Sequence, residues 1–275
     1  MMDEQTQSSI SLAKWVLLVG IILVGTSSYG QSLELGGFVG VSNYNGELQD
    51  TRFDAQNARP AYGIFSRINF SKNVALRTQY FTSEITGTDH ISPGAQSNRN
   101  LNFRTSLQEF GVQLELTLVA FGGTKKTPRA KSYIFGGVSG LYFNPQAQYN
   151  GDWVDLQPLG TEGQGMSGYD KKYSRYAIVC PLGMGFKVNV SKVASLGLEL
   201  GIRKTYTDYL DDVSSFYPDL EQLKRIDPLA STLSYREPEV TGVYGNPTGL
   251  ERGNPANKDI YFFAGVTVSF YLCRF

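Results

Sequence analysis

The densest group of carboxylates in this chain lies in one short segment, residues 207–212, which reads Thr-Asp-Tyr-Leu-Asp-Asp. Asp208, Asp211 and Asp212 offer oxygen ligands of the kind that hard cations such as calcium prefer. Their spacing is not that of an EF-hand loop, and solvated acidic clusters are common in loops. We therefore interpret the segment as a loop that caps one end of the fold through hydrogen bonds and pairing with arginine.

A second polar motif lies near the end of the chain, where Arg252 and Asp259 stand on either side of Gly253-Asn254-Pro255. Glycine followed by Asn-Pro is typical of a turn. The two opposite charges flank this turn, so they could form an ion pair.

No combination of residues predicts catalysis. The chain has one histidine, His90, in a loop rich in Gly, Pro, Ser and Asn. A single loop histidine leaves no histidine-based metal cluster and disfavours a Ser-His-Asp site. The pair Gly136-Gly137 lies inside a strand pattern and not in a phosphate-binding loop. We predict no enzyme activity, no catalytic residue, no cofactor and no metal site, and we expect Cys180 and Cys273 to be unpaired.

Alternation with a period of two dominates the elements that would position these residues. In residues 110–118, phenylalanine, valine and leucine at even positions alternate with Gly, Gln, Glu and Thr. Similar patterns predict strands over 33–44, 61–70, 74–83, 110–118, 132–143, 176–189, 196–203 and 260–272.

The connections between these strands alternate in length. Residues 71–73, 119–131 and 191–192 form three turns, and the segments 45–60, 84–102, 144–175 and 207–258 are long. Short turns on one side and long loops on the other are typical of an outer-membrane barrel, as are strands of about 9–11 residues. The sequence thus predicts an all-β fold: a single antiparallel transmembrane β-barrel of about eight strands with long extracellular loops and short periplasmic turns. A soluble, secreted β-sandwich is the alternative.

The polar face of the predicted strands carries charged residues. If the apolar face meets lipid, these charges point into the barrel interior, which in a barrel of about eight strands is just wide enough for side chains to fill. Isolated charges there would be costly, whereas paired ones are tolerated. We therefore expect a salt-bridged plug formed by Glu34, Arg67, Arg77, Glu109, Glu115, Lys187, Glu199 and Arg203.

The N-terminal segment has the features of a secretion signal. Lys14 precedes the apolar run 15–24, and the small residues Ser28 and Gly30 match a cleavage site. The run is too short for a membrane-spanning helix of about 20 residues. We expect a signal peptide over 1–30, cleavage near Gly30/Gln31, a barrel domain over 31–275, and localisation in the outer membrane of a Gram-negative cell.

Composition supports this reading and excludes one class of partner. Lys and Arg number 25 and Asp and Glu number 25, so the formal net charge is zero. Nucleic-acid-binding proteins usually carry a basic excess, so nucleic acid is not an expected partner. Aromatic residues are abundant and charged residues make up only 18% of the chain, as expected for a barrel that contacts lipid.

Three segments resemble the PorG-like outer-membrane barrels of Bacteroidota. They are Leu-Gly-Gly-Phe-Val-Gly at 35–40, the stretch 203–214 around Asp208, Tyr209, Asp211 and Asp212, and the stretch 252–265 from Arg252 through Asp259. The resemblance implies a non-enzymatic component of the type IX secretion and gliding machinery. It further implies an anchor or organiser of a periplasmic ring, with a ring lipoprotein as its protein partner. The alternative is a small porin-like or hydrophobic-solute barrel of general envelope function.

The last strand raises a question of register. Outer-membrane barrels typically end in an alternating strand with a terminal aromatic residue, and Phe275 is such a residue. Its parity matches Tyr271 and not the lipid-facing set that ends at Leu272. Either the pattern ends at Leu272, or the strand contains a β-bulge near Cys273.

Overall fold

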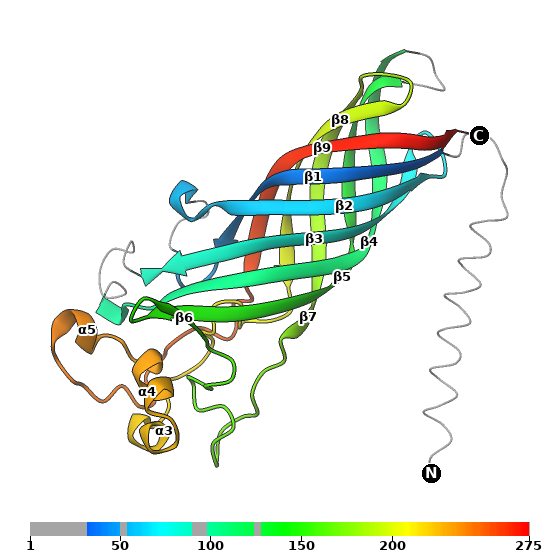
Figure 1. Ribbon diagram of the computed structural model, residues 1–275. Helices are drawn as coiled ribbons and strands as arrows, with labels where there is room; N and C mark the ends of the chain where they lie inside the picture. Colours follow the sequence, from blue (N-terminus) through cyan, green and yellow to red (C-terminus); the bar gives the residue numbers. More distant parts are fainter. Residues whose placement is uncertain (1–31, 50–53, 90–97, 124–127, 275) are drawn as a thin grey trace, which may run out of the picture.

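The structure is a computed structural model that describes residues 32–49, 54–89, 98–123 and 128–274 (Figure 1). Eight strands pair in antiparallel fashion with their neighbours along the chain, and the last pairs with the first, so the sheet closes into a barrel. The predicted barrel is confirmed. Its strands are β1 (Ser32–Asn45), β2 (Arg59–Asn69), β3 (Val74–Thr88), β4 (Asn102–Gly123), β5 (Pro128–Tyr149), β7 (Tyr176–Asn189), β8 (Ala194–Thr205) and β9 (Ile260–Arg274).

The alternation in sequence becomes an alternation between the outside and the inside of the barrel. In β8, Leu198 is 60% exposed, whereas the neighbouring Glu199 is 3% exposed. Successive side chains of a strand point to opposite faces, so the apolar set covers the outer wall. Among the large apolar residues exposed on that wall are Val39, Ile64, Phe110, Ile178, Leu182, Leu196, Leu198, Leu200 and Val266.

One predicted connection is wrong. Residues 119–131 were expected to be a turn, but β4 continues to Gly123 and β5 already begins at Pro128. A register shift between Thr117 and Val119 marks a β-bulge in this hairpin. The bulge interrupts the even-numbered apolar alternation, which is why the strand was expected to end near residue 118.

Aromatic side chains and glycines share the centre of the barrel interior. The ring of Phe263 lies 5.7 Å from that of Phe38 and 6.2 Å from that of Phe135, measured between centroids. The Phe135 ring needs the space above Gly183, since a Cβ added to that glycine would come within 2.4 Å of its Cζ. Glycine on the inward face thus lets the rings fill the interior.

The long loops carry short elements at one end of the barrel. The strand β6 (Asp152–Asp155) pairs with the end of β5. The remaining elements are η1 (Ala55–Asn57), α3 (Leu220–Ile226), α4 (Pro228–Ser234) and α5 (Pro238–Thr241). The α-helices lie at the opposite end of the barrel from the end of β9 (Figure 1). We call the end with the long loops the mouth.

Two short helices begin at aspartates. The side chain of Asp219 accepts a hydrogen bond from the backbone N–H of Gln222 at the start of α3, and Asp227 caps α4 in the same way. Such caps satisfy N–H groups that have no partner inside the helix. The apolar faces of these helices pack on the long segment between β5 and β7: Leu156 and Leu233 belong to one apolar cluster, and Met166 and Leu223 belong to another.

The final strand contains the bulge that its parity suggested. Leu33 pairs with Cys273 while Glu34 pairs with Tyr271, so Leu272 is the additional residue. Phe275, His90 and the predicted signal segment lie outside the described residues. Cys180 and Cys273 are free, as expected. Within the described part of the chain, no helix combines the length and apolar character needed to cross a membrane.

Candidate functional site

All eight charged residues expected on the polar face lie inside the barrel, and each is at most 3% exposed. We call them the lumenal charges. Arg67 joins two acids: its Nη1 donates to Glu34 Oε2 at 3.0 Å and its Nε donates to Glu115 Oε1 at 2.9 Å. Lys187 Nζ donates to Glu34 Oε1 at 2.7 Å from the other side.

Other lumenal pairs reach across the interior. Arg77 on β3 donates through Nη1 to Glu199 on β8 at 2.6 Å. These strands are not neighbours in the sheet, so the ion pair connects separate parts of the wall. Tyr133 also donates its hydroxyl to Glu199. Acids and bases thus fill the interior with paired charge.

The pair of Glu109 and Arg203 forms a separate unit nearer the mouth. Arg203 Nε donates to Glu109 Oε2 at 2.8 Å, and the Tyr261 hydroxyl donates to the same oxygen at 3.0 Å. The guanidinium of Arg203 lies over the ring of Phe263, 4.0 Å from its centroid. Hydrogen bonds and ring contact together offset part of the cost of burying this ion pair.

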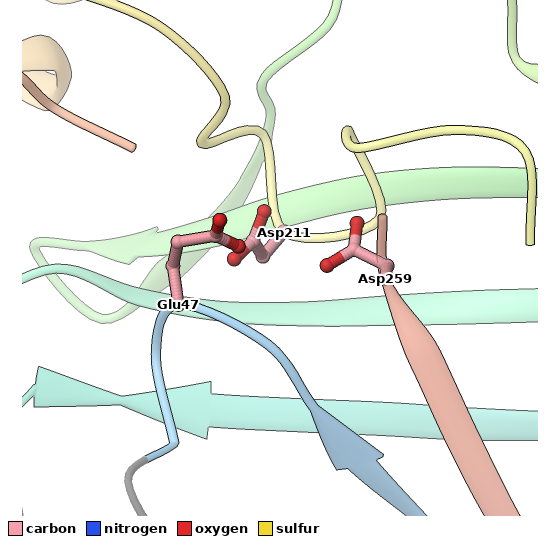
Figure 2. Close-up of side chains that lie close together, drawn as sticks. All are labelled: Glu47, Asp211 and Asp259. Carbon is pink, nitrogen blue, oxygen red and sulfur yellow. The ribbon is translucent and has the colours of Figure 1, made fainter. Parts of the chain in front are cut away.

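A second group lies at the mouth, where Glu47, Asp211 and Asp259 converge (Figure 2). We call these three residues the mouth cluster. Glu47 follows β1, Asp211 lies in the loop after β8, and Asp259 directly precedes β9. Because β9 lies between β1 and β8 in the sheet, the three segments meet at one side of the rim. One carboxylate oxygen from each residue lies within 4.8 Å of the other two.

Tyr44 extends from the end of β1 into the mouth cluster and is fully buried. Its hydroxyl lies 2.6 Å from Asp211 Oδ2 and 3.0 Å from Asp259 Oδ1. Backbone N–H groups bind the other oxygens of the two aspartates: Val213 donates to Asp211 Oδ1 and Leu210 donates to Asp259 Oδ2. The aspartates are therefore held rigidly with their carboxylates facing each other.

Burial and mutual repulsion raise the pKa values of the three carboxyl groups in the mouth cluster. Burial, with the nearby Asp208 adding to it, raises the pKa of Glu47 to about 7. Burial also raises the pKa values of Asp211 and Asp259 well above the ordinary aspartate value, and for both the charge of Glu47 raises them further. Arg99 lowers the pKa of Glu47 only in part, and among the described residues no arginine or lysine forms an ion pair with any of the three carboxylates.

Asp212 faces a different network, although it follows Asp211 directly. Its side chain accepts hydrogen bonds from the hydroxyls of Thr161 and, at 2.6 Å, Tyr173. Burial raises the pKa of Asp212 to about 6, while Arg252 lowers it in part. Asp212 has a positive φ of 65°, and this left-handed turn directs its side chain away from the mouth cluster.

The predicted ion pair between Arg252 and Asp259 is wrong. Arg252 Nη1 donates to Glu162 Oε1 at 3.0 Å, and Arg252 Nη2 lies 3.9 Å from Asp212 Oδ2. Asp259 points into the mouth cluster instead (Figure 2). Neither Glu162 nor Glu47 stood out in the sequence, because each is a single acid in a loop and its partners are distant along the chain.

The remaining residues of the loop motif support the mouth through packing. The ring of Tyr209 stacks on that of Tyr173, with centroids 4.3 Å apart. Asp208 accepts a hydrogen bond from the Ser214 hydroxyl at 2.8 Å. The expected cap over the rim is present, with hydrogen bonds and an arginine pairing through Arg252.

A comparison with known protein families identifies the family of this chain. Residues 13–235 match the family described as a domain of unknown function, DUF6089. The chain belongs to this family. The DUF6089 description names no activity or partner, and a search of curated proteins finds no match.

Solved structures similar to this DUF6089 chain are distant from it. Neisserial surface protein A has a TM-score of 0.44 at 8% identity, over 88% of this chain and 98% of that one. The attachment invasion locus protein of Yersinia pestis has a TM-score of 0.40 at 7% identity, over 90% and 99%. Outer membrane protein OprG from Pseudomonas aeruginosa has 0.38 at 11%, over 88% and 96%. These TM-scores are all below 0.5, so the barrel fold is assigned from the strand pairing in this structure and not from these neighbours.

Proposed function

We propose that this protein is a non-enzymatic outer-membrane barrel that anchors or organises the periplasmic ring of a type IX secretion system. The observation that carries the proposal is a closed barrel with an apolar outer wall and an interior filled by paired charges. A protein of this kind is suited to hold a position in a membrane and to bind a partner there.

The outer wall supports a membrane location. Contiguous apolar surface of this kind is rare on soluble monomers, and an apolar band around a closed barrel is what lipid requires. Tyrosines are exposed toward the mouth side of the band, among them Tyr62, Tyr176 and Tyr206. Tyrosine is enriched at membrane–water interfaces. Tyr44 and Tyr261, at the mouth ends of β1 and β9, point inward instead and are buried.

The interior argues for a structural role over transport. The ion pairs that cross the lumen occupy the path a solute would take. Moving a solute through would require separating buried ion pairs, which costs several kcal/mol. The resemblance to PorG-like barrels is the basis for the proposed secretion pathway and for the ring lipoprotein as the proposed partner. In this arrangement the short turns face the periplasm and the mouth faces outward.

Deletion of the gene tests the proposal. We expect loss of protein export through the type IX pathway, restored by a plasmid copy of the full chain. Normal export in the deletion strain would contradict the proposed role.

A small porin-like or hydrophobic-solute barrel is the competing function. Planar-bilayer recording of the purified protein separates the two possibilities. We expect no resolvable channel events, and discrete conductance steps would favour the porin-like alternative.

A further inference from the structure

The mouth cluster differs from the lumenal acids, because none of its three members forms an ion pair with a residue that the structure describes. The lumenal acids each pair with arginine or lysine, and Glu162 pairs with Arg252. We propose that Glu47, Asp211 and Asp259 bind a divalent cation, calcium by the chemistry of its ligands, and that this ion ties together three loops of the mouth. The inference does not depend on the secretion pathway proposed above.

The geometry fits one ion. Calcium binds carboxylate oxygens at about 2.3–2.6 Å, so two oxygens on opposite sides of the ion lie about 4.6–5.2 Å apart. One oxygen from each of the three residues lies within 4.8 Å of the others. The carboxylates of Asp211 and Asp259 face each other, and that of Glu47 approaches from the side (Figure 2). Calcium tolerates such irregular geometry better than magnesium, which demands a near-ideal octahedron.

Two buried oxygens point independently to a missing ligand. Glu47 Oε2 is shielded from solvent and has no hydrogen-bond partner among the described residues. The same is true of Oδ1 of Asp208, a residue that is only 2% exposed. Asp208 lies close enough to the cluster for its charge to act on both Glu47 and Asp259. An unsatisfied buried carboxylate oxygen is costly and calls for a partner.

The hydrogen bonds of Tyr44 also leave one carboxylate oxygen of the cluster without a donated proton. The Tyr44 hydroxyl has one proton, yet it lies within hydrogen-bond distance of both Asp211 and Asp259. Only one of these two contacts can be a donated hydrogen bond if both acids are ionised. A cation between the carboxylates removes the repulsion that remains.

The nearby basic side chains form their closest contacts with other groups. Arg99 binds Asp89 through Nε and Nη2, at 2.8 and 2.6 Å. Its Nη2 also donates to the backbone oxygen of Glu47 at 3.3 Å, but Arg99 forms no ion pair with the Glu47 carboxylate. Arg252 binds Glu162, and Lys258 Nζ donates to the backbone oxygen of Pro255 at 2.7 Å. These bases leave the negative charge of the mouth cluster for a bound ion to neutralise.

The test uses the full-length protein purified in detergent and stripped with EDTA. Titration with calcium is followed by the thermal unfolding midpoint and by the luminescence of terbium, a calcium substitute that a neighbouring tyrosine sensitises. Tyr44 lies at the site and would act as this antenna. We expect calcium to raise the midpoint, and terbium luminescence to appear and to be displaced by calcium.

The variant Glu47→Gln removes one ligand and one negative charge. We expect it to abolish the calcium-dependent shift, while its midpoint without calcium equals or exceeds that of the wild type, because the Gln amide can donate to the facing aspartates. Asp219→Asn, at the start of α3 and outside the cluster, is the matched control and keeps the full shift.

The wild-type titration decides the matter even if a variant fails to fold. No calcium-dependent shift together with no terbium luminescence would overturn the proposal. A midpoint that responds to pH and not to calcium would also overturn it, since protons alone would then satisfy the cluster. If calcium still raises the midpoint of Glu47→Gln by the full amount, calcium binds at another site and this assignment is overturned.

Discussion

At the scale of single residues, the protein is organised by buried charges that either have partners or lack them. Taking an ion out of water costs several kcal/mol, and attraction between partners returns this only when the geometry is good. In the lumen every acid has a base whose nearest nitrogen lies 2.6–3.0 Å from a carboxylate oxygen. At the mouth cluster the acids meet one another instead. The paired charges hold strands on opposite sides of the lumen together. In the mouth cluster the carboxylates repel one another, and a bound cation would remove this repulsion.

Arg203 and Glu109 offer the cleanest test of the lumenal pairs, since their ion pair is separate from the others. Arg203→Met leaves the buried Glu109 carboxylate with the Tyr261 hydroxyl as its remaining donor among the described residues. The change should destabilise the protein by about 3–5 kcal/mol. The double variant Arg203→Met/Glu109→Gln should be closer to the wild type, because no uncompensated charge remains. Urea unfolding in detergent measures both. Equal losses in the single and double variants would contradict the pairing.

Asp208 gives a prediction for pH. Burial raises its pKa from the ordinary value of 3.8 to about 6. The folded state therefore holds this proton more tightly than the unfolded state, so the contribution to stability is full at low pH and declines as the pH rises toward 6. In EDTA the unfolding midpoint should fall as pH rises over this range, and Asp208→Asn should make the fall shallower. An unchanged slope in the variant would show that Asp208 does not titrate there.

At the scale of elements, the spacing between strands depends on glycines that face inward. Gly183 pairs with Gly201 across β7 and β8. A Cβ at position 183 would meet the Phe135 ring at 2.4 Å and the Leu200 backbone oxygen at 2.5 Å. Contacts this short force the strands or the ring to move.

Gly183→Ala should therefore destabilise the barrel by about 1–3 kcal/mol, the usual cost of overpacking. Gly140→Ala is the control, because the nearest atom to its added Cβ, the backbone oxygen of Phe110, is 4.0 Å away. Unfolding of both variants in the same detergent gives the comparison. A Gly183→Ala variant as stable as Gly140→Ala would mean that the interior is more adaptable than the distances imply.

The same scale shows what sequence could predict. Alternation located all eight barrel strands, because each has one face on the outer wall and one face on the interior. It failed at residues 119–131, where a bulge breaks the period. Asp211 and Asp259 were singled out from sequence, but Glu47 was not. Its role depends on β1 lying beside β9, a long-range pairing that local patterns do not contain.

At the scale of the whole molecule, the outer wall should be embedded in lipid. Leu198 lies midway along β8 and is 60% exposed. Leu198→Lys would place a charge in the apolar band and should cost about 2–4 kcal/mol if the site lies near the bilayer centre. Tyr244→Lys, in the loops at the mouth, should cost little. Folding equilibria in lipid vesicles measure the difference, and equal stability of the two variants would contradict a membrane-embedded wall.

The most direct test of the central proposal is capture of the partner from its own membrane. The tagged protein is purified from detergent-solubilised outer membranes, an unrelated small barrel with the same tag serves as control, and co-purifying proteins are identified by mass spectrometry. We predict recovery of a periplasmic ring lipoprotein of the secretion system with this protein and not with the control. Recovery of the barrel alone would contradict the anchoring role.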